Sequence, residues 1–175
     1  MTAMNSMLSA ALAFGAMAFV QSASATVAPP PCKGDICTAK DKLVLSGVVE
    51  TKCSLKVNAK AEATKLNIVD GEANTLVATV TESTNHLAGY KVTMSSANGG
   101  NLVHTSVPSE KVAYKLSYDG GAYLSPTTSA QQVKLTGALV APVVDNSDVK
   151  INFAGKPSAL AGTFSDTVTF EIAAL

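Results

Sequence analysis

The chain has 175 residues, and its 13 basic residues balance its 13 acidic residues at a net charge of zero. This balance argues against nucleic-acid binding, because a basic excess supplies most of the affinity for nucleic acid. All the basic residues are Lys, and with only two His the chain offers little for catalysis or phosphate recognition. We therefore expect neither an enzyme nor a cofactor.

The first 25 residues are predicted to be a signal peptide. An apolar core at residues 7–20 is followed by small residues ending in Ala-Ser-Ala at 23–25, which is typical of a cleavage site. The apolar run is too short to span a bilayer, so we expect export without a membrane span. The remainder divides into an N-terminal segment, 26–42, and one domain, 43–175.

The N-terminal segment contains three prolines at 29–31, which predict a stiff, extended spacer. Cys32 and Cys37 enclose a turn-forming sequence, and we expect a local disulfide between them. A metal site is the alternative, but with no His nearby it would need other ligands. Cys53 is predicted to be buried as a small hydrophobic residue, with an intermolecular bridge as the alternative.

Residues 43–57 alternate without interruption, which predicts one long, half-buried β-strand. The large apolar residues of one face are Leu43, Leu45, Val49, Leu55 and Val57. Burying all five would contribute roughly 7 to 15 kcal/mol as an upper bound, which rivals the stability of a whole domain. What covers this face therefore decides whether the domain stands alone.

The rest of the chain consists of short apolar segments separated by turn signals, which predicts an all-β, antiparallel sandwich. Residues 59–65 are expected to form at most one helical turn. The predicted strands lie at 65–69, 76–81, 90–95, 102–105, 112–118, 133–140, 149–153 and 163–172.

Other polar groups receive structural interpretations. His86 and His104 are expected at the surface, because neither lies in a local catalytic signature. Residues 145–148 are predicted to be a solvated turn, since the Gly and distal Glu of a calcium loop are absent. Three tyrosines are expected to pack across strands, with a sugar-stacking patch as the alternative: Tyr114, Tyr118 and Tyr123.

Three passages resemble subunits of chaperone-usher pili and the related spore-coat-U-type secreted proteins. LVLSGVVETKC at 43–53 resembles the first pilin strand. GYKVTMSS at 89–96 is similar to an aromatic middle strand of that family. AGTFSDTVTFEI at 161–172 resembles the last pilin strand.

The resemblance implies an immunoglobulin-like sandwich that lacks one strand and so leaves an apolar groove. A periplasmic chaperone would fill the groove first, an outer-membrane usher would take part in assembly, and a neighbour's N-terminal arm would follow. Because prolines and cysteines occupy 26–42, such an arm has to use residues 42–49. The implied contacts are Leu43, Leu45, Gly47 and Val49 of the arm, and Gly162, Phe164, Val168, Phe170 and Ile172 of the groove.

The expected function is that of a structural subunit of a cell-surface pilus or fimbria, with a role in adhesion, assembled from copies of itself by donor-strand exchange. The alternative is a self-contained secreted or surface β-sandwich that binds a ligand or coats the cell without polymerising. Either function places the protein beyond the inner membrane, exported through the periplasm to the cell surface or secreted.

Overall fold

The computed structural model describes residues 40–175. The predicted signal peptide and the predicted disulfide between Cys32 and Cys37 lie outside these residues. The chain divides into two units, Met1–Ser46 and Gly47–Leu175. Within the described part of the first unit, residues 40–46, there is no helix or strand, and every strand described belongs to the second unit.

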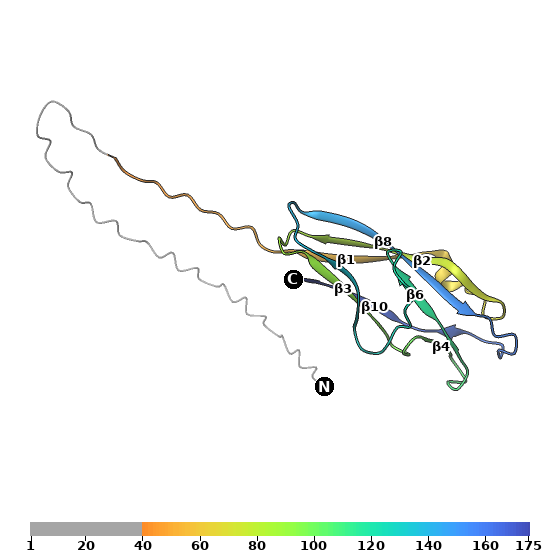
Figure 1. Cartoon of the computed structure of the whole chain (residues 1–175). Coiled ribbons are helices and arrows are strands. Elements are labelled where there is room, and N and C mark those ends of the chain that lie inside the picture. Colours follow the sequence, from red (N-terminus) through yellow and green to blue (C-terminus); the bar gives the residue numbers. More distant parts are fainter. Residues whose placement is uncertain (1–39) are drawn as a thin grey trace, which may run out of the picture. The chain divides into compact units, whose positions relative to one another are not determined.

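The second unit is an all-β, antiparallel sandwich, as the sequence predicts (Figure 1). One sheet has the strand order β1-β2-β8-β6, the second has the order β10-β3-β7, and a small third sheet has the order β5-β4-β9. A 3₁₀ helix, η1 at Ala61–Thr64, follows β1 where one helical turn was predicted. The strands are β1 Cys53–Ala59, β2 Gly71–Thr84, β3 Tyr90–Ser96, β4 Asn101–His104, β5 Lys111–Ala113, β6 Lys115–Tyr118, β7 Gln131–Thr136, β8 Val143–Ala154, β9 Phe164–Ser165 and β10 Val168–Ala174.

The core lies between the two larger sheets, because each buries alternate side chains against the other. Every second residue of β3 is buried, and β8 follows the same pattern over its second half. A direct contact across the sandwich joins Tyr118 of β6 to Phe170 of β10, with ring centroids 5.5 Å apart. The main core residues are Val80, Tyr90, Val92, Met94, Leu116, Tyr118, Val149, Ile151 and Phe153.

The predicted long strand over 43–57 is wrong in its first part, because β1 begins only at Cys53. Its pairing partner explains the boundary: β2 ends at Thr84, which lies opposite Cys53, so the ladder has no strand to continue along. The alternating pattern correctly identified a sequence able to form a strand. The pattern did not show whether a neighbouring strand is present to pair with the first half of residues 43–57.

Four other predicted elements differ from the structure. No strand forms over 65–69, where the backbone N–H of Gly71 donates to the carbonyl of Asn67 and closes a turn. Residues 145–148, predicted to be a turn, belong to β8. The predicted strands 112–118 and 163–172 are each interrupted, the first at Tyr114 and the second at residues 166–167.

Candidate functional site

β1 is an edge strand of the four-stranded sheet, and its inner face is open. Val57 lies opposite Val80 of β2, and directly opposed side chains share one face of a sheet. Val80 is fully buried, yet Val57 is 45% exposed. Leu55 is likewise only partly buried, although Glu82 opposite it is fully buried. The core-facing side chains of β1 are therefore only partly covered by other elements.

β10 is an edge strand of the second sheet and shows the same asymmetry. Phe170 lies opposite Met94, and Ile172 lies opposite Val92. The two residues of β3 are buried, whereas their partners on β10 are only partly buried. β10 pairs with β3 on one side, and among residues 40–175 no strand pairs with its other side.

An apolar cavity of about 340 Å³ connects the two edge strands. Val57 and Ala59, late in β1, line it together with Val168 and Phe170, early in β10, so the two strands run in opposite directions. We call the space between Cys53–Ala59 and Val168–Ala174, including this cavity, the slot. Within residues 40–175, each of the two edge strands leaves backbone N–H and C=O groups unpaired on its outer side, which an added strand can pair with. Cα atoms of β1 and β10 approach within 8 Å of one another, and a strand paired with both needs about 9 to 10 Å, so insertion has to move the two rims apart.

The last-strand residues predicted as groove contacts divide between two places. Val168 and Phe170 line the slot, and Ile172 lies on the same face of β10. Gly162 and Phe164 line a smaller cavity of about 240 Å³. Ala63 and Leu66 line both cavities, so the smaller one continues the slot.

The structure gives Gly162 a packing role that the sequence did not reveal. A Cβ atom at this position would come within 2.1 Å of His104 Nε2. The His104 ring meets the Phe164 ring edge-on, with centroids 5.0 Å apart. His104 is buried, so its predicted surface position is wrong. Its Nδ1 accepts the backbone N–H groups of Ser106 and Val107, both at 3.1 Å.

The predicted arm residues lie in a segment that has neither regular structure nor cover. Within residues 43–49 the five large aliphatic side chains are between 83% and 93% exposed. Among the remaining positions, Gly47 has open space around it. Clusters of large aliphatic side chains seldom stay in water, so this segment is a candidate to bind an apolar surface. The five side chains are Leu43, Val44, Leu45, Val48 and Val49.

Cys53 is exposed rather than buried, which corrects its prediction. It lies opposite the buried Thr84, with Cys53 Sγ 3.3 Å from Thr84 Oγ1, so it points to the core side. Like Val57, it lies on the core-facing side of β1 without being buried. The alternating sequence predicted the correct face of the strand for Cys53, but it did not predict that Cys53 is exposed.

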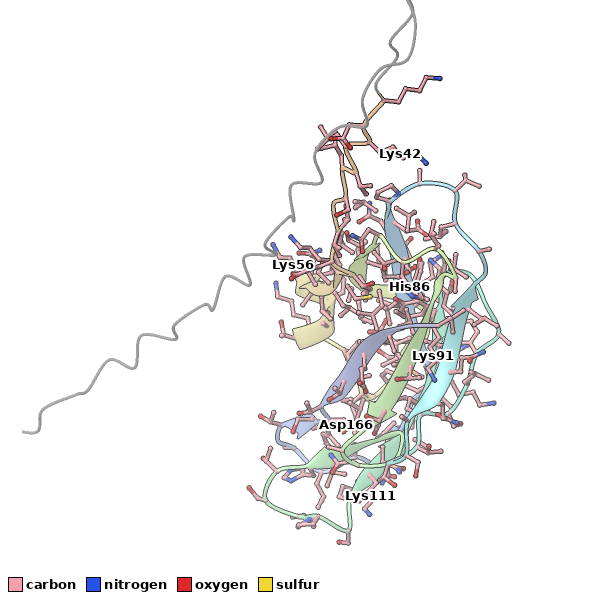
Figure 2. All side chains as sticks on the ribbon, turned by 90° about the vertical axis from the view of Figure 1, so that its left-hand side faces the viewer. Lys42, Lys56, His86, Lys91, Lys111 and Asp166 are labelled. Atoms are coloured by element: carbon pink, nitrogen blue, oxygen red, sulfur yellow. The ribbon has the colours of Figure 1, made fainter. Side chains whose placement is uncertain are left out.

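Asp166 fixes the break between β9 and β10, beside the slot (Figure 2). Its carboxylate accepts hydrogen bonds from Ser96 Oγ at 2.6 Å, Tyr114 Oη at 2.7 Å and the backbone N–H of Asn98 at 3.0 Å. Burial, and then the bond to Asp166, raises the pKa of Tyr114, so its hydroxyl stays a donor. This network holds the start of β10 in place.

Glu82 forms a second polar cluster between the sheets, which the sequence analysis missed. Its buried carboxylate accepts hydrogen bonds from Tyr90 Oη at 2.7 Å and from Tyr118 Oη, and Lys134 Nζ lies 3.1 Å away. Burial favours a raised pKa for Glu82, but these hydrogen bonds outweigh it and hold the pKa below its ordinary value. The sequence signal for this cluster was an acidic residue on the apolar face of a strand, as in Val80-Thr81-Glu82.

Tyr114 and Tyr118 are both buried in these clusters, and Tyr123 Oη donates to Asn74 Oδ1 at 2.9 Å. The alternative of a sugar-stacking patch built from these three tyrosines is therefore wrong. His86, labelled in Figure 2, follows β2 and is partly buried. Within residues 40–175 no three His, Cys, Asp or Glu side chains gather as a metal site.

Comparisons with protein-family models and with curated proteins find no match to this chain. In the described part of the chain, no helix is long and apolar enough to cross a membrane. The slot and the exposed segment before β1 are the features of residues 40–175 that bear most directly on function.

Proposed function

We propose that the chain is a structural subunit of a cell-surface pilus or fimbria, in which residues 43–49 of one copy fill the slot of another. The observation that carries this proposal is the pairing of an apolar slot with two open rims and an exposed, alternating apolar segment in the same chain. The subunit is exported through the periplasm. A chaperone covers the slot until an outer-membrane usher brings the next copy.

The dimensions of the segment and the slot support the proposal. Residues 43–49 extend over about 20 Å as a strand, at about 3.3 Å per residue. β1 and β10 each have seven residues, so a seven-residue strand matches the length of both rims once they move apart. In an extended strand, Leu43, Leu45 and Val49 point to one face, as an apolar slot requires.

The energetics favour insertion only when both rims are used. Burying Leu43, Leu45 and Val49 contributes about 4 to 9 kcal/mol, whereas association costs about 4 to 15 kcal/mol. Apolar contacts alone therefore roughly cancel the cost. Backbone hydrogen bonds, at about 0.5 to 1.5 kcal/mol each, add the surplus along two seven-residue rims.

Because β1 and β10 run in opposite directions, an inserted strand is antiparallel to one rim and parallel to the other whichever way it enters. The proposal takes the direction that is antiparallel to β10. In that direction Val49 lies near Val168, and the donor domain lies beyond the beginning of β10. Each copy then offers its segment at one end and its slot to the next copy. Heterologous contacts of this kind produce a filament when the rotation between copies does not close into a ring.

The test compares two substitutions at neighbouring, equally exposed positions. Leu45 and Val44 are 84% and 83% exposed, so Lys at either position leaves the single subunit stable. Leu45→Lys places a charge in the slot and abolishes polymers, whereas Val44→Lys points away and retains them. The measurement is the ladder of polymers that survives mild denaturant. A wild-type chain that stays monomeric and unfolds reversibly would instead support the self-contained sandwich.

A further inference from the structure

Asn85 holds the root of the exposed segment through three hydrogen bonds. Its Oδ1 accepts the backbone N–H of Lys52 at 2.7 Å, and its Nδ2 donates to the carbonyl of Glu50 at 2.8 Å. Its own backbone N–H donates to the carbonyl of Lys52 at 3.3 Å. One residue thus continues the β1–β2 ladder past Cys53 and Thr84, where the strands end.

We propose that Asn85 is a positioning residue that makes residues 43–49 available to the slot of another copy by opposing their insertion into the slot of the same chain. The inference rests on the proposed function and adds a regulatory element to it. Insertion into the same chain competes with assembly, because residues 43–49 and the slot belong to one chain. An intramolecular strand needs no partner, and it would block assembly.

Chain length excludes one of the two intramolecular arrangements. A strand parallel to β1 would require the link between residues 49 and 53 to run the length of β1. From Cys53 to Ala59 that is about 20 Å at 3.3 Å per residue. Four Cα steps reach only about 14 Å, so this arrangement cannot form.

The second arrangement is a hairpin, in which residues 50–52 turn back and residues 43–49 pair antiparallel with β1. Loops of three residues are a common hairpin class, so chain length permits it. The turn, however, must include Glu50 and Lys52, which Asn85 holds in line with β1. The two side-chain hydrogen bonds of Asn85 oppose the hairpin, and Asn85 therefore favours insertion into a neighbour.

The experiment compares the full-length wild-type chain with Asn85→Ala, Asn85→Asp and a matched control. Asn58→Ala is the control, because Asn58 Nδ2 also donates across the β1–β2 pair, to Thr81 Oγ1 at 3.3 Å, but away from the root. Each protein is refolded at low concentration, and amide hydrogen exchange of residues 43–49 is measured in the monomer. The concentration is then raised, and the polymerisation rate is recorded.

We expect rapid exchange over 43–49 in wild-type and Asn58→Ala monomers. In Asn85→Ala we expect at least tenfold protection of these amides and polymerisation about tenfold slower, since two side-chain hydrogen bonds are lost. Asn85→Asp keeps the acceptor for Lys52 and should fall between them, which maintains the test if the alanine variant folds poorly. Simple destabilisation would not protect residues 43–49.

The inference is overturned if the Asn85→Ala monomer exchanges as fast as wild type over 43–49, or if it polymerises at the wild-type rate. Its failure differs from that of the proposed function. If only the inference fails, the wild-type chain still polymerises and only the role of Asn85 is lost. If the proposed function fails, the wild-type chain never polymerises at any concentration, and both proposals fall together.

Discussion

Replacing Lys134 by Met is a direct test of the buried cluster that joins the two sheets. Lys134 Nζ lies 3.1 Å from Glu82 Oε2, 2.6 Å from Asp145 Oδ2 and 3.0 Å from Asp119 Oδ2. Burial tends to lower the pKa of Lys134, but its hydrogen bonds to the three carboxylates outweigh this and raise it. Methionine keeps most of the apolar part of the side chain and removes the ammonium group, with its charge and its hydrogen-bond donors.

The expected cost follows from what remains around Glu82. Removing one partner of a buried ion pair typically destabilises by about 3 to 5 kcal/mol, because the other charge is left buried. Tyr90 and Tyr118 still donate to Glu82 after the substitution, which favours the lower end. We therefore expect a loss of about 3 kcal/mol from a total stability of about 5 to 15 kcal/mol.

Urea unfolding gives the measurement, as a midpoint lowered by about 1 to 3 M at a typical slope for a small domain. Lys91→Met on β3 is the control (Figure 2), since Lys91 makes no ion pair within residues 40–175, and its cost should stay within about 0.5 kcal/mol. Glu82→Gln combined with Lys134→Met should cost less than the sum of the two. The reasoning is refuted if Lys134→Met and Lys91→Met are equally stable, because Glu82 would then not be a buried charge.

Three further predictions concern other parts of the domain. Gly162→Ala should lower stability by about 1 to 3 kcal/mol in thermal unfolding, because the added Cβ meets His104, and an unchanged melting temperature would contradict the packing at this glycine. The lowered pKa of Glu82 contributes stability that is present above pH about 4 and is lost as the pH falls through the folded-state pKa. Glu82→Gln should therefore flatten the acid side of a profile of stability against pH. Parallel profiles for the variant and the wild type would count against this prediction. Cys53 should react rapidly with a thiol reagent in the monomer and at least tenfold more slowly in polymers, and equal rates would argue against a filled slot.

Periodicity was sufficient to predict the class of fold and most of the strands. Tyr90, Val92 and Met94 alternate with polar residues, and they form one face of β3 as expected. The turn at Gly99 and Gly100 was also predictable, because both have positive φ angles, 60° and 75°, which glycine adopts without strain. These features depend on neighbouring residues only.

Features that depend on distant residues could not be predicted in this way. His104 is buried because residues 161–164 pack on it, and these lie almost 60 positions later. Glu82 is buried because Tyr118 and Lys134 supply donors from other strands. Asn85 resembles any loop residue in the sequence, and only its position opposite Lys52 shows that it holds the chain before β1.

The sequence by itself determined that residues 43–57 are able to form a strand with one apolar face, since side-chain alternation is a local property of the chain. Only the tertiary structure decided that pairing starts at Cys53, leaving 43–49 exposed, and that β1 and β10 stand on either side of an open slot. The physical reason is that burial requires a second surface. Whether such a surface exists depends on how all the strands are arranged.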